Sequence, residues 1–260
     1  MQGDRGMDKT MLGDAGCMQY GIAPHVHVCV TSEGSVLLDL KRDKYLGVGR
    51  EETEILAQAV QGWPRPLWTA TLEGATVSTK ARAAELCGSM LESDLLTRRE
   101  DSKTDPLGIG CRRDMRGDWI SVGDEVEVNA AVSWRHCIHF MHAYLWARSS
   151  LAWRPILRTV EEVRRRKAGA SPARPWHLSE VAGLVDVFRR LRPFWFAAEG
   201  RCLLHALTLI RFLSKHEFYP EWVIGVTTQP WGAHSWAQWG DYLLDTNPEK
   251  VCAYTPILVV

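Results

Sequence analysis

The segment from Gly200 to Lys215, GRCLLHALTLIRFLSK, is the strongest indication of the fold of the C-terminal half of this 260-residue chain. It predicts a helix over 201–215 with apolar residues on nearly every face, which places that helix in a core. Cys202 falls in its first turn, where unpaired backbone N–H groups and the helix dipole lower a thiol's pKa and can hold an oxyanion. Cys202 is therefore a candidate nucleophile. The alternative is a buried small apolar residue, the role we expect for Cys87, Cys137 and Cys252.

Two strands follow this helix and carry the other candidate catalytic residues. The run 222–227 predicts a buried strand, 234–239 predicts the next one, and Gly240-Asp241 makes a two-residue turn into 242–245. With that turn, Trp239 pairs with Tyr242 and the register continues outward along both strands. His234 and Asp245 then share one face of the hairpin as diagonal neighbours, close enough for an imidazole to meet a carboxylate.

Asp245 is the predicted orienter of His234, and Asn247 is the alternative. Asn247 lies directly opposite His234 in the predicted register, and Cys-His-Asn arrangements also work in catalysis. Asp241 sits in the turn and is excluded. The order Cys202, His234, Asp245, on a helix followed by two strands, is that of a papain-type thiol enzyme.

The sequence of residues 21–100 predicts a small module whose strands precede its helices, unlike the C-terminal half. Strand-like runs at 25–30, 35–40 and 45–48 are separated by turns, and helical periodicity follows from Glu51 and again over 79–90. Three strands followed by helices indicate a winged-helix-like module over 21–100, after a flexible tail at 1–20. Residues 101–128, rich in Asp, Gly and Arg, read as a linker. The second domain then spans 129–260, with helices from about 129, at 156–167 and at 180–190, and the fold class is α+β.

Composition narrows the class of protein. Hydrophobic residues make up 46% of the chain, enough for a sizeable core, and no stretch approaches the length of a membrane span. The seven cysteines have no paired spacing, which fits a reducing, cytoplasmic location. We expect no metal site, since His136, His139 and His142 cannot share one ligand face of a helix. Residues 1–130 hold 15 Lys and Arg against 21 Asp and Glu, whereas 131–260 hold 16 against 10.

Several motifs together resemble a known family. The stretches RCLL at 201–204, VIGV at 223–226, AHSW at 233–236 and YTPIL at 254–258 resemble the transglutaminase-like peptidase of lasso peptide biosynthesis, the B protein. Residues 25–62, with VLLDL at 36–40 and YLGV at 45–48, resemble the leader-peptide recognition element of ribosomal peptide pathways. One departure is Ser235, where the family most often has Ala after the His.

This resemblance implies a fold, an activity and partners. The fold is a papain/transglutaminase-like cysteine peptidase joined to a recognition element. The activity is removal of the leader from a precursor peptide, with Cys202 as nucleophile, His234 as base and then acid, and Asp245 as orienter. The leader would add as a strand at Tyr45, Leu46, Gly47 and Val48.

The implied partners are the precursor peptide and an asparagine-synthetase-like cyclase, with neither nucleic acid nor membrane. The resemblance implies no cofactor for the chemistry itself, although ATP is required in the assembled system. The sequence has no GxxxxGK[ST] loop, so ATP would act through the partner or through a site without a familiar motif.

Three other functions remain open at this level. The same residues could transfer an acyl group to an amine, as a transglutaminase does. The chain could be a non-catalytic escort that only binds leaders. The strand-helix pattern of the first hundred residues also suggests a winged-helix DNA-binding regulator, although the acidic balance of that half argues against it.

Overall fold

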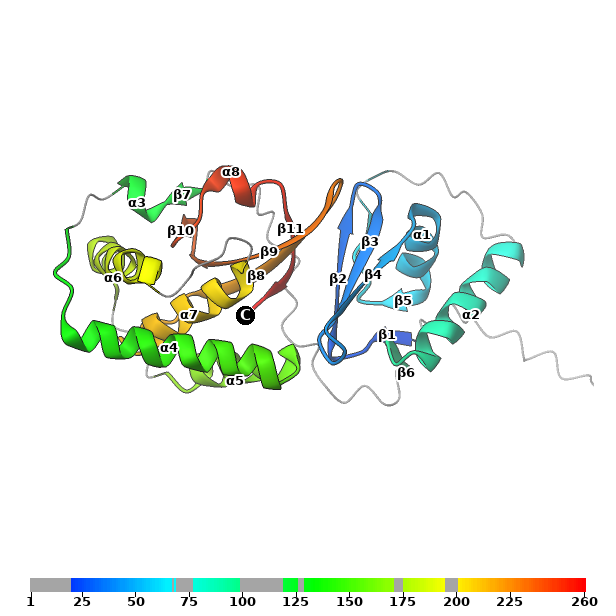
Figure 1. Ribbon diagram of the computed structural model, residues 1–260. Helices are drawn as coiled ribbons and strands as arrows, with labels where there is room; N and C mark the ends of the chain where they lie inside the picture. Colours follow the sequence, from blue (N-terminus) through cyan, green and yellow to red (C-terminus); the bar gives the residue numbers. More distant parts are fainter. Residues whose placement is uncertain are drawn as a thin grey trace, which may run out of the picture.

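The computed structural model describes residues 20–66, 68, 77–98, 119–125, 129–170, 175–194 and 201–260. Figure 1 shows these residues as two modules side by side, an N-terminal one and a larger C-terminal one. Both modules mix helices with sheets, as the α+β class requires. The tail at 1–19 and most of the expected linker lie outside the described residues.

The N-terminal module is built around an antiparallel sheet in the order β2-β3-β4. Its strands, β2 (Val26–Thr31), β3 (Gly34–Asp39) and β4 (Lys44–Val48), match the three predicted runs closely. Gly34, with φ of +141°, directly follows the two-residue turn between β2 and β3, and a Cβ there would collide with the Val48 carbonyl oxygen. This hairpin therefore requires glycine.

Helices and a second small sheet complete this module. The helices α1 (Arg50–Ala59) and α2 (Val77–Glu92) were predicted from their periodicity. The short strands β1 (Tyr20–Ile22), β5 (Val60–Gln61) and β6 (Leu96–Arg98) were not predicted, and they form a sheet in the order β5-β1-β6. Strands of two or three residues carry too few side chains to show a period.

Every residue of β3 is buried, which explains its unbroken apolar run. Leu37 packs with α1 in one core cluster, whereas Val36 and Leu38 belong to the main core of the C-terminal module. A strand covered on both faces loses the polar alternation of a half-exposed strand. The sheet β2-β3-β4 is thus packed between its own helix and the second module.

The C-terminal module contains a five-stranded sheet in the order β11-β8-β9-β10-β7. Its long hairpin joins β8 (Glu221–Thr228) to β9 (Trp231–Trp239), and β10 (Tyr242–Leu243) follows the predicted turn. β11 (Thr255–Val259) pairs with β8 and also contacts β2 of the other module. β7 (Ile120–Ser121) pairs in parallel with β10 and is followed by α3 (Val122–Glu125). The structure therefore places residues 119–125, which we expected in the linker, within the C-terminal module.

Helices α4 to α7 pack around the central strands (Figure 1). The predicted helices are present as α4 (Trp134–Trp153), α5 (Ile156–Ala168) and α6 (Leu178–Leu191), with a 3-10 turn over Arg192–Phe194. α7 (Cys202–Ser214) is the central helix and buries eight of its thirteen residues, between α4 on one side and β9 on the other. A short helix, α8 (Pro248–Val251), connects β10 to β11.

Candidate active site

Cys202 is the first residue of α7, as predicted. Its thiol is free and half-buried. Arg201 occupies the N-cap position, and its side chain makes no capping hydrogen bond to the first turn. The first backbone N–H groups of a helix have no partner within the helix, so at this end they can stabilise a thiolate or an oxyanion. The buried remainder of α7 holds this end in place.

His234 lies on β9, directly opposite Gly225 of β8. Its ring stacks on Trp236, with centroids 6.0 Å apart, and is tilted against Tyr254 at 5.3 Å. Within the described part of the chain its buried Nε2 atom has no hydrogen-bond partner. Burial lowers the pKa of His234, and the charges of Lys250 and His205 lower it further. A neutral imidazole with a vacant nitrogen can accept a proton at neutral pH.

Gly225 allows the close packing of these rings. A Cβ at Gly225 would come within 2.9 Å of both the Trp236 ring and the Cβ of Tyr254. Both residues contact the imidazole of His234, so a side chain at Gly225 would displace its surroundings. The packing of Trp236 and Tyr254 against β8 thus depends on a residue without a side chain.

Asp245 is almost fully buried, with 6% of its side chain exposed, and binds three basic groups. Its carboxylate accepts from Arg189 Nε at 2.9 Å, lies 3.0 Å from His205 Nε2 and also accepts from Arg192 at 3.3 Å. Burial alone would raise the pKa of Asp245. The hydrogen bond to His205 and the charge of Arg192 outweigh it and hold this pKa below its ordinary value.

The strand register that we predicted beyond β10 is not formed. The ladder matches the prediction at Trp239–Tyr242 and Gln238–Leu243, and Leu244 still donates to Ala237. The chain then turns away, so the expected pairing of Asn247 with His234 is wrong. Asn247 instead caps α8 by accepting from the backbone of Glu249. The imidazole that meets Asp245 is His205, and no hydrogen bond joins Asp245 to His234 among the described residues.

His205 is a site residue that the sequence reasoning missed. It lies three residues after Cys202 on α7, and residues three apart share one face of a helix. Its ring also packs edge-on against Phe188 of α6, with centroids 5.4 Å apart. The helical spacing of Cys202 and His205 was a signal that could have identified it. By contrast, nothing local could reveal that α6 supplies Arg189.

The residues predicted to bind a leader lie on β4, which forms the edge of the N-terminal sheet and, among the described residues, pairs only with β3. Leu46 is exposed, and Gly47 has open space where a side chain would be. A cavity of about 380 Å³ lies between this strand and the β8–β9 turn, lined by Gly47 and Val48 on one side and by Thr228 and Trp231 on the other. The edge strand and the C-terminal module therefore enclose a common space.

Tyr45 connects the edge strand to the site. Its ring meets that of Trp231 edge-on at 5.6 Å, and it packs against the main core. Burial raises the pKa of Tyr45 to about 12, with further contributions from the nearby Cys202 and Asp43. Its phenol therefore stays protonated at physiological pH. Of the four predicted leader-binding residues, Tyr45 is the one that packs against the core of the C-terminal module.

Two of the three histidines of α4, His136 and His139, have structural contacts. His136 accepts from the backbone of Ser133 at the start of the helix, and His139 lies 3.3 Å from His216. Within the described residues, no group of three or more His, Cys, Asp or Glu side chains is placed to hold a metal ion. Over the same residues, no helix combines the length and apolar character needed to cross a bilayer.

Comparison with known proteins bears on the C-terminal module. Residues 141–259 match the family model of the transglutaminase-like superfamily. The chain contains a transglutaminase-like domain. The match covers Cys202, His234 and Asp245, and a transglutaminase-like domain fits a cysteine peptidase or acyltransferase fold. Searches of curated proteins and of solved structures found no significant match. The N-terminal module lies outside the matched residues, so its winged-helix-like assignment stays a prediction.

Proposed function

We propose that this protein is a leader peptidase of lasso peptide biosynthesis, which binds a precursor's leader and hydrolyses the leader-core bond. The observation that carries the proposal is the position of Cys202. Its thiol heads the buried helix of a transglutaminase-like domain, and the edge strand β4 of the other module contributes Tyr45 nearby. A thiol at a helix N-terminus suits acyl chemistry, and an adjacent sheet edge suits capture of an extended peptide.

The proposed reaction begins with proton transfer from the Cys202 thiol to His234. The sulfur attacks the scissile carbonyl, and the N–H groups of the first turn of α7 hold the oxyanion. As the C–N bond breaks, His234 returns the proton to the departing core amine and a leader thioester remains. Water then attacks the thioester while His234 takes its proton. The C–S bond breaks, the leader leaves with a free carboxylate and the proton returns to the thiolate.

Asp245 completes the proposed catalytic set as a positioning residue. Its carboxylate fixes His205, which lies on the same face of α7 as Cys202 and contributes to the electrostatics of His234. Asn247 is engaged in capping α8. These contacts favour Asp245 over Asn247 in this role.

Leader binding is proposed to occur by strand addition at β4. An extended peptide there would pair with the free edge of β4, beside Leu46 and Gly47, and reach the cavity beneath Trp231. From this position its C-terminal end can continue to the thiol. The released core would pass to an asparagine-synthetase-like cyclase, with ATP required by the assembled system. We place this activity in the cytoplasm, where the free thiol stays reduced.

Acyl transfer to an amine is the second candidate, because the transglutaminase-like domain fits that reaction equally well. The two reactions differ only in whether water or an amine accepts the acyl group from Cys202. A hydrolase yields two fragments whose masses add up to the precursor plus one water. An acyltransferase yields a cross-linked product that retains the acyl group.

The test is mass spectrometry of a lasso precursor incubated with the protein, with and without ATP and the cyclase. We expect one cut that is lost in Cys202→Ala and retained in Cys252→Ala, a change at an exposed cysteine. An uncut precursor that still binds would overturn the peptidase and leave an escort protein. A cut that survives in Cys202→Ala would also overturn it.

A further inference from the structure

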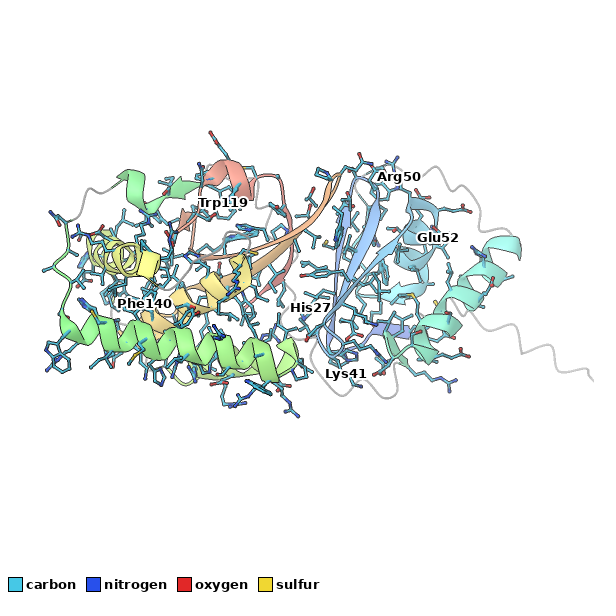
Figure 2. All side chains as sticks on the ribbon, in the orientation of Figure 1. His27, Lys41, Arg50, Glu52, Trp119 and Phe140 are labelled. Atoms are coloured by element: carbon cyan, nitrogen blue, oxygen red, sulfur yellow. The ribbon has the colours of Figure 1, made fainter. Side chains whose placement is uncertain are left out.

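Helix α4 exposes large apolar side chains on the face turned away from the core. Trp134 is 69% exposed, Ile138 47%, Met141 41% and Leu145 54%. Figure 2 shows α4 along the outer edge of the molecule, with side chains projecting into solvent. Single exposed apolar residues are common, but a contiguous group on one element marks an interaction surface.

These four residues, which we call the α4 stripe, lie on one line. Their spacing of four, three and four residues keeps them on one side of a helix of 3.6 residues per turn. The opposite side of α4 carries Phe140, Ala143 and Ala147, all fully buried. The fold therefore already has the apolar face that it needs from α4. The stripe is a second apolar face, with the spacing of a helix-pairing seam.

The charged residues beside the stripe indicate which kind of partner surface would bind to it. The sequence of α4 contains no Asp or Glu. Arg135 and Arg148 lie near the two ends of the stripe, and neither contacts a carboxylate among the described residues. A matching surface would carry an apolar row with carboxylates along its edges.

A second copy of this chain matches the stripe poorly. Pairing two copies through the stripe would bring together two helices that both carry Arg135 and Arg148 and that both lack Asp and Glu. Like charges directly opposed across an interface are repulsive. The pattern thus favours a different protein over self-association.

We propose that the α4 stripe docks an amphipathic helix of a protein partner whose apolar row is edged by Asp and Glu. We identify this partner as the asparagine-synthetase-like cyclase of lasso peptide biosynthesis, and this identification rests on the proposed function. Helix α4 lies along the outer edge of the C-terminal module, whereas β4 belongs to the other module (Figure 1). A cyclase held there leaves the leader-binding edge free.

The experiment uses the full chain and the purified cyclase of the same pathway, with binding measured by calorimetry. We expect Ile138→Glu/Met141→Glu to weaken binding at least 10-fold while leader cleavage by the variant alone is unchanged. Arg135→Glu/Arg148→Glu should weaken binding about 10-fold at low salt and less at high salt. The matched control is Arg158→Glu/Arg165→Glu, a charge reversal at exposed positions on α5, which should bind as the wild type does.

Each alternative has its own outcome. Cleavage by the wild type without cyclase binding, or cyclase binding that the stripe variants do not weaken, overturns the docking surface and leaves the proposed function intact. If the wild-type protein neither cleaves the precursor nor binds the cyclase, the proposed function is overturned as well. Self-association of the wild type that Ile138→Glu/Met141→Glu abolishes assigns the stripe to a second copy. Wild-type binding to anionic phospholipid vesicles that is lost in the same variant assigns it to a membrane surface.

Discussion

The carboxylate of Asp245 has the most consequential contacts of any single residue described at the site. It lies against His205, Arg189 and Arg192, and thereby fixes α6 and α7 to the segment that follows β10. Removing one partner of a buried charge cluster is costly because the others keep their unbalanced charge. The two arginines are partly exposed, which reduces that cost.

Asp245→Asn should therefore lower the free energy of unfolding at pH 7 by about 2 kcal/mol. The folded-state pKa of Asp245 lies below its ordinary value of 3.8. The stabilisation is thus fully present above that value and is lost as pH falls through the folded-state pKa. Urea unfolding should show a difference in the free energy of unfolding between variant and wild type that is smaller at pH 3 than at pH 7. Equal stabilities at pH 7 would contradict this assignment.

The charge of Lys250 affects the proposed base. Lys250 is exposed and lowers the pKa of His234, in addition to the effect of burial. Lys250→Ala should raise this pKa, so His234 becomes protonated at higher pH. The acidic limb of the kcat/KM profile should move upward by a few tenths of a pH unit, roughly the size expected for a screened surface charge. Lys215→Ala, at an exposed lysine that does not act on His234, is the control and should leave the limb in place.

At the scale of elements, the β8–β9 pair depends on Gly225. Gly225→Ala should lower the free energy of unfolding by about 1–3 kcal/mol, because its methyl group would push against Trp236 and Tyr254. It should also lower kcat, since both residues contact His234. Gly88→Ala is the control: its position in α2 has open space, and alanine is the better helix former. A Gly225→Ala variant with wild-type stability and activity would show that the strand pair tolerates the methyl group.

A substitution on the edge strand β4 can test leader binding without changing the stability of the protein. Gly47 has no neighbour where a side chain would be placed and lines the cavity shared with Trp231. Gly47→Val should keep thermal stability, because valine favours strands. It should weaken leader binding about 10-fold by occupying the cavity, as measured by fluorescence anisotropy of a labelled leader; the estimate corresponds to about 1.4 kcal/mol. Lys44→Val on the same strand, outside the cavity lining, should bind the leader normally.

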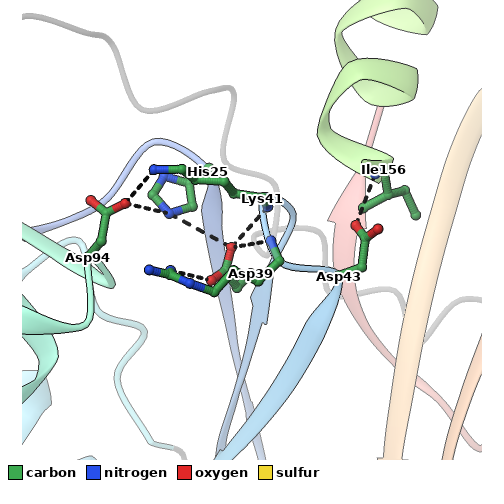
Figure 3. A network of polar contacts seen from close by, with 7 residues as sticks. His25, Asp39, Lys41, Asp43, Asp94 and Ile156 are labelled. Atoms are coloured by element: carbon green, nitrogen blue, oxygen red, sulfur yellow. Dashed lines mark hydrogen bonds and ion pairs between the residues drawn. The ribbon is translucent and has the colours of Figure 1, made fainter. Parts of the chain in front are cut away.

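At the scale of the whole molecule, the two modules share a core and polar contacts. Asp43 accepts from the backbone N–H of Ile156 at 2.9 Å and so caps α5 from the other module (Figure 3). Leu157 donates to the backbone of Leu40 at the same junction. His25, Asp39, Lys41 and Asp94 form a polar network on the N-terminal side of this junction (Figure 3). The orientation of β4 relative to Cys202 depends on this junction.

Asp43→Ala should lower the free energy of unfolding by about 1 kcal/mol, the usual effect of losing a helix cap. Hydrogen exchange should become faster at the start of α5 and along β4, with little change at α2. Asp43→Asn is the matched control, since asparagine can also cap a helix and adopts the left-handed conformation found at this residue, φ +55°. Unchanged exchange in Asp43→Ala would show that the other contacts at the junction are sufficient to hold the modules together.

The local elements could be predicted from the sequence, because each depends on neighbours in the chain. Periodicity predicted β2, β3 and β4, the helices around Cys202, and the two-residue turn at Gly240. The transglutaminase-like character of residues 141–259 was likewise anticipated from motifs in a single chain. Alternation and helical spacing are set by backbone geometry within a few residues, so a pattern of apolar side chains is sufficient to reveal them.

The contacts between side chains that are distant in the sequence could not be predicted and became visible in the folded structure. The predicted register was correct as far as Leu243, but the chain then leaves the sheet, and Asp245 meets His205. Likewise β7, expected in a linker, completes the sheet beside β10, and Tyr45 reaches the neighbourhood of Cys202 from the other module. These contacts join residues far apart in sequence, and their geometry follows from how helices and sheets pack into a shared core. No local pattern encodes that packing.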